Sequence, residues 1–367
     1  MTNYSHPYLT VCLLDGCNKA CKHCYRTAIP SGHGFKLQQK EAIASLDDAT
    51  SLATACLFAG GEPTIWQQDG MDFLSLLVKA SKQNGSACFL SNGHVFEEKD
   101  YAYEFVRRYI DECGKHLRMI LSVDLIHANY NAEEQRIPFL DNLITARAAC
   151  AGKENMTLAI LSHWTSDERL NIPLRVLQKY ADQGVPYEIA DFMMWGEAAD
   201  ISDLACYVGV GSKNKDSLGP YRTFLTQRMI AAEKIEDKKE FEELPNRELL
   251  KRLSVCGRAP NFFISWDTSY YYCIPQMGHD WFSISEIGKL SLDAIASFHA
   301  DRPVIKKIQE LSIFGVLDEY RQLIPEQLNE EISLMRESIR FAGCSVCLRL
   351  HREGVLEKIN QRLLNES

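Results

Sequence analysis

Apolar, β-rich runs alternate with amphipathic helical patterns from Tyr8 to about Ala190. The strand candidates are Leu9–Leu14, Ala55–Ala59, Ala87–Leu90, Met119–Val123, Thr157–Leu161 and Tyr187–Ala190. Helical patterns lie between them, near residues 37–50, 70–83, 97–112, 136–151 and 168–183. This alternation predicts a parallel sheet with helices on its outside. Six strands are fewer than the eight of a complete barrel, so we expect the α/β class with an open, partial (β/α)6 barrel.

Three cysteines lie close together on the loop that follows the first predicted strand. Cys17, Cys21 and Cys24 have the spacing C-x3-C-x2-C. Thiolates are the soft ligands that iron–sulfur clusters require, and three of them leave one iron of a cubane open to another ligand. The alternatives are a zinc knuckle or unrelated core thiols. Zinc sites usually present C-x2-C pairs, so the gap of three residues favours a cluster.

The cysteine spacing, with His23 just before the third cysteine, resembles the signature of the radical S-adenosylmethionine (SAM) enzymes. The resemblance implies a [4Fe-4S] cluster whose open iron binds the amino and carboxylate groups of SAM. One electron then cleaves SAM to a 5′-deoxyadenosyl radical, which abstracts a substrate hydrogen. The same resemblance marks His23 and Tyr25 as cofactor-binding residues. It also implies an electron donor such as flavodoxin or ferredoxin.

A glycine-rich turn follows the second predicted strand, with the sequence Gly60-Gly61-Glu62-Pro63. Two glycines let a backbone approach a ligand closely, and a proline stiffens the exit from the turn. A plain βα turn with a solvated glutamate is the alternative. The turn is similar to the GGEP motif of radical SAM enzymes, and this likeness implies that Glu62 binds the amino group of SAM.

Two further strand ends resemble family segments. Ser91-Asn92-Gly93 is similar to a T-N-G turn, so Asn92 is a candidate cofactor-binding residue, with an ordinary tight turn as the alternative. Ser122-Val123-Asp124 resembles an S-x-D segment, in which Ser122 would contact the ribose or carboxylate of SAM; Asp124 belongs to the same candidate site.

Arg136 is a candidate partner for the cofactor carboxylate, because a guanidinium fork suits that geometry. A surface arginine that begins a helix is its alternative.

A second set of cysteines follows in the last third of the chain: Cys256, Cys273, Cys344 and Cys347. Between the first two, Asn261–Trp266 and Tyr270–Tyr272 predict a β-hairpin around residues 267–269. Four cysteines complete either a tetrahedral zinc site or a fully ligated cubane, and their chemistry alone leaves both open.

The order of hairpin, helical spacer and C-x2-C pair resembles the "twitch" version of the SPASM domain, over roughly residues 256–347. That resemblance implies one auxiliary [4Fe-4S] cluster. Relatives usually have a glycine five residues before the second cysteine, where this chain has Thr268. We therefore expect a partial barrel over 1–205, a helical bridge over 206–250, a twitch-like α+β domain over 251–350 and a C-terminal helix over 351–367.

Composition restricts the partners and the compartment. The chain has 40 basic and 49 acidic residues, a formal charge of −9, and it lacks the basic stripe that nucleic-acid binding needs. Its longest apolar runs fall short of the ~20 residues of a membrane span. Thirteen cysteines without a secretory signal favour a reducing compartment, so we expect a cytoplasmic protein.

The sequence therefore predicts a radical SAM enzyme that completes an oxidative modification, a cross-link or a dehydrogenation, with an auxiliary cluster. A peptide or natural product is the expected substrate. Two alternatives stay open: a dehydrogenase of small, aminocyclitol-like molecules, and a metal-stabilised binding protein without enzymatic activity. No residue of the sequence is singled out as a catalytic acid or base.

Overall fold

The protein is described from a computed structural model. The structure describes residues 8–19, 35–52, 55–122, 136–151, 155–164, 187–192, 204–210, 262–264, 268–271, 280–330 and 343–366. These segments also contain short 3-10 helices: η1 (Pro63–Ile65), η2 (His94–Glu97), η9 (Asp280–Phe282) and η10 (Arg321–Leu323).

Ten strands form one sheet in the described part of the chain, in the order β12-β11-β10-β1-β2-β5-β6-β7-β9-β8. They are β1 (Tyr8–Cys12), β2 (Ala55–Ala59), β5 (Ser86–Ser91), β6 (His116–Ser122), β7 (Met156–Trp164), β8 (Tyr187–Phe192), β9 (Leu204–Val210), β10 (Phe262–Ile264), β11 (Ser269–Tyr271) and β12 (Ser283–Glu286). Neighbours from β10 through β1, β2, β5 and β6 to β7 are all parallel. A separate two-stranded ribbon pairs β3 (Gln67–Gln68) with β4 (Met71–Asp72).

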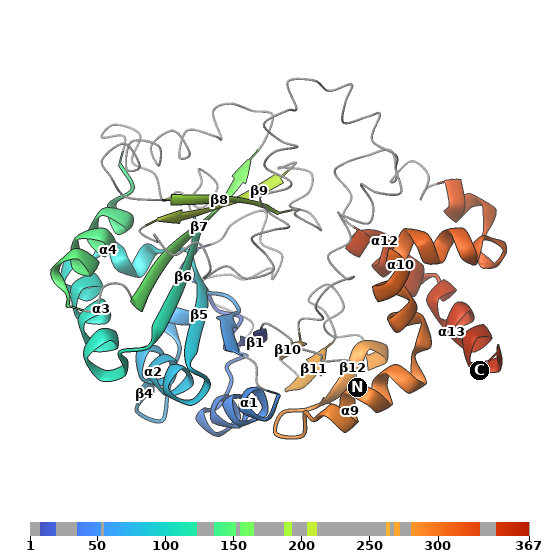
Figure 1. Cartoon of the computed structure of the whole chain (residues 1–367), viewed down its shortest axis with the longest axis horizontal. Helices are drawn as coiled ribbons and strands as arrows, with labels where there is room; N and C mark the ends of the chain where they lie inside the picture. Colours follow the sequence, from blue (N-terminus) through green and yellow to red (C-terminus); the bar gives the residue numbers. More distant parts are fainter. Residues whose placement is uncertain are drawn as a thin grey trace.

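Helices cover the outer face of the parallel strands (Figure 1). They are α1 (Gln39–Ser51), α2 (Phe73–Asn84), α3 (Lys99–Cys113) and α4 (Pro138–Ala149). The ends of α2 show why it begins and ends where it does: the Asp72 carboxylate accepts a hydrogen bond of 2.8 Å from Ser75 N–H, and Gly85 terminates the helix at a φ of 80°. The expected helix near 168–183 lies outside the described residues.

Alternation along the strands separates two apolar faces. On the outer face, Phe58 of β2 and Phe89 of β5 pack with Phe73 of α2 and Phe105 of α3; the ring centroids of Phe73 and Phe89 lie 5.1 Å apart. On the inner face, Cys88 and Ile120 form a smaller buried cluster. The outer face therefore holds most of the core, as expected for a sheet covered by helices.

Two predictions about the sheet need correction. The sixth predicted strand, β8, does not lie beside β7; β9 lies between them and is antiparallel to both. Residues 204–210 had been assigned to the end of the barrel and its helical bridge, but they form β9. An antiparallel neighbour needs no crossover helix, so this edge of the sheet departs from the β/α alternation of the rest.

The predicted hairpin is present: β10 and β11 are antiparallel, and Phe263 pairs with Tyr271. Its first strand also pairs in parallel with β1, so that the hairpin and β12 continue the barrel sheet. The expected division of the chain into four segments stays a prediction.

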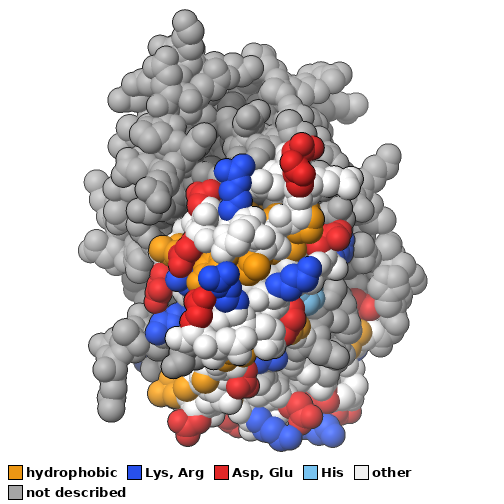
Figure 2. Space-filling view, turned by 90° about the vertical axis from the view of Figure 1, so that its right-hand side faces the viewer, with side chains coloured by type: hydrophobic (Ala, Val, Ile, Leu, Met, Phe, Trp, Pro, Cys, Tyr) orange, Lys and Arg blue, Asp and Glu red, His pale blue; other side chains and the backbone are white. Residues whose placement is uncertain are grey.

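Beyond β12, on the right of Figure 1, the described residues include a group of helices. They are α9 (Leu292–Asp301), α10 (Pro303–Glu319), α12 (Gly343–Arg352) and α13 (Val355–Glu366). The side of the molecule seen in Figure 2 interleaves basic and acidic side chains around small apolar areas. None of the helices in the described part of the chain is long and apolar enough to cross a membrane.

Candidate functional site

The chain that leaves β1 is fixed at the base of the cysteine loop. Leu13 donates a backbone hydrogen bond of 3.1 Å to Ala59 of β2 and accepts one of 2.8 Å from Leu37. Asp15 N–H donates to the Phe35 carbonyl at 3.3 Å. The first residues after β1 and the residues before α1 are thus held together, and the segment between them contains the three predicted cysteine ligands.

Gly60 and Gly61 pack the turn after β2 against the start of the cysteine loop. Gly61 N–H donates to the Leu14 carbonyl at 2.7 Å, and Glu62 N–H donates to the Gly16 carbonyl at 2.9 Å. A Cβ on Gly61 would lie 1.9 Å from the Gly16 oxygen. Gly60 has a φ of 128°, and a Cβ there would lie 2.4 Å from the Leu14 oxygen. Close approach of two backbones, in addition to any ligand, therefore explains both glycines.

Glu62 is almost completely buried, with 1% of its surface exposed. Its Oε1 accepts hydrogen bonds from Thr64 N–H at 3.2 Å and from the Thr64 hydroxyl at 2.6 Å. Its Oε2 accepts one of 2.8 Å from Asn92 N–H. Burial raises the pKa of this carboxyl, and the hydrogen bonds oppose that rise. The carboxylate thus links two turns, the one after β2 and the one after β5. The turn after β2 leads into η1 at the buried Pro63.

Asn92 connects this carboxylate to the cysteine loop. Its side-chain Nδ2 donates to Asn18 Oδ1 at 2.6 Å and to Cys17 Sγ at 3.5 Å. Its Oδ1 accepts from His94 N–H at 3.0 Å, which fixes the orientation of the amide. With its backbone N–H on Glu62, Asn92 brings together the loops that follow β1, β2 and β5.

Cys17 is buried, two N–H groups point at its sulfur, and the thiol also lies 3.8 Å from Asn18 Oδ1 as a donor. Besides Asn92 Nδ2, the Lys19 backbone N–H points at Sγ over 3.4 Å. N–H donors stabilise an anionic sulfur, which is the form in which cysteine binds a metal. The surroundings of Cys17 therefore fit a thiolate ligand of an iron–sulfur cluster.

Ser122 and Arg136 differ in how they relate to these loops. Ser122 ends β6, one residue beyond the partner of Ser91, so it lies at the same edge of the sheet. Arg136 is half exposed and its Nε donates to Asp141 Oδ2 of α4 at 2.8 Å. The structure therefore gives Arg136 a partner within the protein, and its predicted pairing with a cofactor carboxylate stays a prediction.

Several predicted site residues lie outside the described residues: Cys21, His23, Cys24, Tyr25, Asp124, Cys256 and Cys273. Among the residues that the structure does describe, no group of three or more His, Cys, Asp or Glu is arranged to hold a metal ion. The two complete ligand sets therefore stay predictions.

The last two predicted ligands, Cys344 and Cys347, lie one helical turn apart on α12, and Cys347 is buried. His351, one turn further along α12, stacks on Trp281 with ring centroids 5.5 Å apart. His351 thus packs against the aromatic rings that precede β12.

Three side chains that support the site were not singled out from the sequence. Thr64 supplies two hydrogen bonds to Glu62, Asn18 accepts from Asn92, and Trp66 Nε1 donates to the Leu37 carbonyl at 2.9 Å. Asn18 lies within the cysteine loop and Thr64 directly follows the Gly60–Pro63 turn. This closeness to the two motifs was the only sequence signal that could have identified them as supporting residues.

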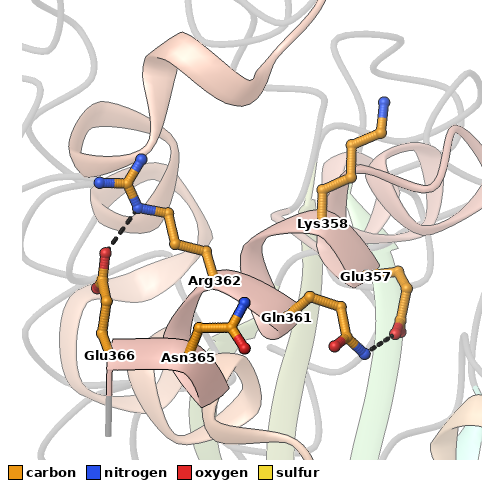
Figure 3. A pocket seen from close by; sticks show the side chains of 6 residues that line it. All are labelled: Glu357, Lys358, Gln361, Arg362, Asn365 and Glu366. Carbon is orange, nitrogen blue, oxygen red and sulfur yellow. Dashed lines mark hydrogen bonds and ion pairs between the residues drawn. The ribbon is translucent and has the colours of Figure 1, made fainter.

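A pocket of about 560 Å³ lies elsewhere, along α13 (Figure 3). All six of its lining residues belong to that one helix, and Arg362 already pairs with Glu366 at 2.7 Å. Because its polar groups all come from one helix and do not converge from several elements, we assign it no chemistry.

Residues 11–124 match the family model for the Radical SAM superfamily. The match begins within β1 and ends just after β6, so it contains the joined loops and the first cysteine set. This part of the chain is similar to the Radical SAM superfamily domain, and members of that superfamily are enzymes that use a [4Fe-4S] cluster and SAM.

Two solved structures are similar to the chain. "Native anSMEcpe with bound AdoMet" has 17% sequence identity and a TM-score of 0.44, and the match covers 78% of this chain and 79% of that one. "BtrN in complex with AdoMet and 2-DOIA" has 10% identity and a TM-score of 0.43, with 84% and 88% covered. No curated protein sequence matches the chain.

Proposed function

We propose that this protein is a radical SAM enzyme in which Cys17, Cys21 and Cys24 hold the [4Fe-4S] cluster that cleaves SAM. One observation carries the proposal. The buried Cys17 sulfur and the buried Glu62 carboxylate are both hydrogen-bonded to Asn92, at the carboxyl ends of three adjacent parallel strands. Sites in parallel α/β folds are built at that edge.

The residues around the cluster position it. Hydrogen bonds at Leu13, Asp15 and Leu37 hold the base of the cysteine loop, while N–H donors at Cys17 stabilise its thiolate form. When bound and reduced, the cluster supplies the electron that cleaves SAM to a 5′-deoxyadenosyl radical. The turn at Gly60–Glu62 and Ser122 lie at the same edge of the sheet and are the proposed SAM-binding residues.

The second cysteine set is proposed to hold one auxiliary [4Fe-4S] cluster through Cys256, Cys273, Cys344 and Cys347. Its support is the hairpin of β10 and β11, which pairs directly with β1, the strand that leads into Cys17. A fully ligated cluster near the barrel is suited to accept an electron once substrate hydrogen abstraction and deprotonation have occurred. The net reaction is then an oxidation of a peptide or natural product in the cytoplasm.

Metal analysis of the anaerobically reconstituted protein tests both cysteine sets. We expect about eight irons per chain, and about four in the Cys17→Ala/Cys21→Ala/Cys24→Ala variant. Cys344→Ala/Cys347→Ala should lose the other four, since two of the four auxiliary ligands are removed. Zinc bound in place of iron would contradict the proposal and support the metal-stabilised binding protein.

Cys88→Ala is the matched control. Cys88 is buried, like Cys17, but it belongs to neither predicted ligand set and packs with Ile120 on the inner face of the sheet. Its iron content should equal that of the parent. A loss of iron in Cys88→Ala as large as in the triple variant would show that cysteine removal acts through folding.

A further inference from the structure

We infer that Asn92 is a positioning residue for the proposed SAM-cleaving cluster: its amide orients Cys17 and donates a hydrogen bond to the ligating sulfur. This inference rests on the proposed function. It assigns Asn92 a task different from the direct SAM contact expected from the sequence, because the side-chain amide faces the cysteine loop.

The backbone N–H and both side-chain polar atoms of Asn92 have hydrogen-bond partners. The backbone N–H donates to Glu62, Oδ1 accepts from His94 N–H, and Nδ2 donates to Asn18 Oδ1 and Cys17 Sγ. The residue is 7% exposed, so these bonds face little competition from water. The amide is thus fixed in one orientation, with its donor end toward the sulfur.

The anchor of Asn92 is itself rigid. Glu62 is buried and receives two further hydrogen bonds from Thr64, at 3.2 and 2.6 Å. Gly93 follows with a φ of 78°, and a Cβ there would lie 2.8 Å from the Phe139 ring of α4. The turn that carries Asn92 is therefore held from β2 on one side and from α4 on the other.

A hydrogen bond to a cluster thiolate withdraws negative charge from the sulfur. The reduced cluster carries one more electron than the oxidised cluster, so it gains more from the donor, and the reduction potential rises. Removal of the donor should lower the potential. Residues that orient metal ligands in this way typically change metal affinity by about 10–100-fold.

Three variants of the full-length, reconstituted protein test the inference. Asn92→Ala removes the donor without adding charge. Asn92→Asp keeps the Oδ1 acceptor for His94 N–H and replaces the donor by a negative oxygen. His94→Ala is the control, because its half-exposed side chain pairs only with Glu97 on the same turn.

The measurement is the fraction of reduced cluster at a set solution potential, taken from the part of the electron paramagnetic resonance signal that changes when SAM is added. We expect the reduced-to-oxidised ratio to fall about tenfold in Asn92→Ala, which is about 59 mV for a one-electron couple. The reduced-to-oxidised ratio should fall further in Asn92→Asp. Iron should leave both variants about tenfold faster in the presence of a chelator. His94→Ala should match the parent.

A reduced fraction in Asn92→Ala equal to that in His94→Ala would overturn the inference and leave the proposed function intact. If circular dichroism shows that Asn92→Ala does not fold, Asn92→Asp decides by the same comparison. A parent that binds no SAM-sensitive cluster would overturn the inference together with the proposed function.

Discussion

At the scale of single residues, Thr268 has a backbone conformation that its side chain disfavours. Its φ of 62° lies in the left-handed region, and its carbonyl accepts a hydrogen bond of 2.9 Å from Ile287 N–H. The resemblance to the twitch domain predicted a glycine at this position. The backbone keeps the conformation that a glycine would adopt, although the residue is β-branched.

Thr268→Gly should stabilise the fold. Release of the left-handed strain contributes about 1–2 kcal/mol, and the greater freedom of glycine in the unfolded chain offsets about 0.4–1 kcal/mol of it. We expect a net gain of about 0.5–1 kcal/mol and a higher midpoint of thermal unfolding. Ser269→Gly, within β11, is the matched control and should lower the midpoint. If both glycine variants lower the midpoint equally, the turn is not strained.

The chemistry of the cysteine loop could be predicted from residues, but its hydrogen bonding could not. The spacing of Cys17, Cys21 and Cys24 indicates a metal ligand set without knowledge of the fold. The partners of Glu62 come from Thr64 and from Asn92, which is thirty residues away and reaches Glu62 only because β2 and β5 are neighbours. Sequence alone likewise left Arg136 either a partner of the cofactor carboxylate or a surface arginine that begins a helix; in the structure it pairs with Asp141 of α4.

At the scale of elements, the parallel strands and their helices were predictable because their signals are local. The strand expected at Ala55–Ala59 is β2, and the helix expected near 70–83 is α2 (Phe73–Asn84). The strand β9 was not predicted because small residues and glycine dilute its apolar run at Leu204–Val210. Which strand pairs with which depends on long-range contacts. The alternation of strands and helices along the chain therefore does not predict that β9 lies antiparallel between β7 and β8.

Asp48 of α1 joins the first helix of the barrel to the strands that follow Cys256. The carboxylate accepts hydrogen bonds from the Tyr270 hydroxyl of β11 at 2.5 Å and from Gly288 N–H at 2.7 Å. It is 6% exposed, and burial raises its pKa despite these hydrogen bonds. The attachment of the hairpin therefore depends on a buried acid as well as on the pairing of β10 with β1.

Asp48→Asn should change how stability depends on pH. Because the pKa is higher in the folded than in the unfolded protein, the folded state binds more protons between the two values. The contribution of Asp48 is thus fully present below pH ~3.8 and is lost as the pH rises through the raised, folded-state pKa. The asparagine keeps an acceptor for Tyr270 but does not titrate, so its unfolding free energy should decline less over that range.

Urea unfolding of both proteins across acid to neutral pH measures this difference. Parallel curves for parent and Asp48→Asn would show that Asp48 has no altered pKa in the folded state.

At the scale of the whole molecule, one sheet connects the two cysteine sets. The order β12-β11-β10-β1-β2 places the hairpin between Cys256 and Cys273 directly beside the strand that leads to Cys17. Tyr270 then fastens this hairpin to α1. The hairpin and the strand that leads to Cys17 therefore belong to the same sheet.

The most direct test of the account is the release of 5′-deoxyadenosine after anaerobic reconstitution, dithionite reduction and addition of SAM. We expect release by the parent and by Cys88→Ala, and none by the Cys17→Ala/Cys21→Ala/Cys24→Ala variant. Asn92→Ala should release it about ten times more slowly, since its cluster is harder to reduce. An iron-loaded parent that leaves SAM intact would contradict the assignment of Cys17, Cys21 and Cys24 as the site of SAM cleavage.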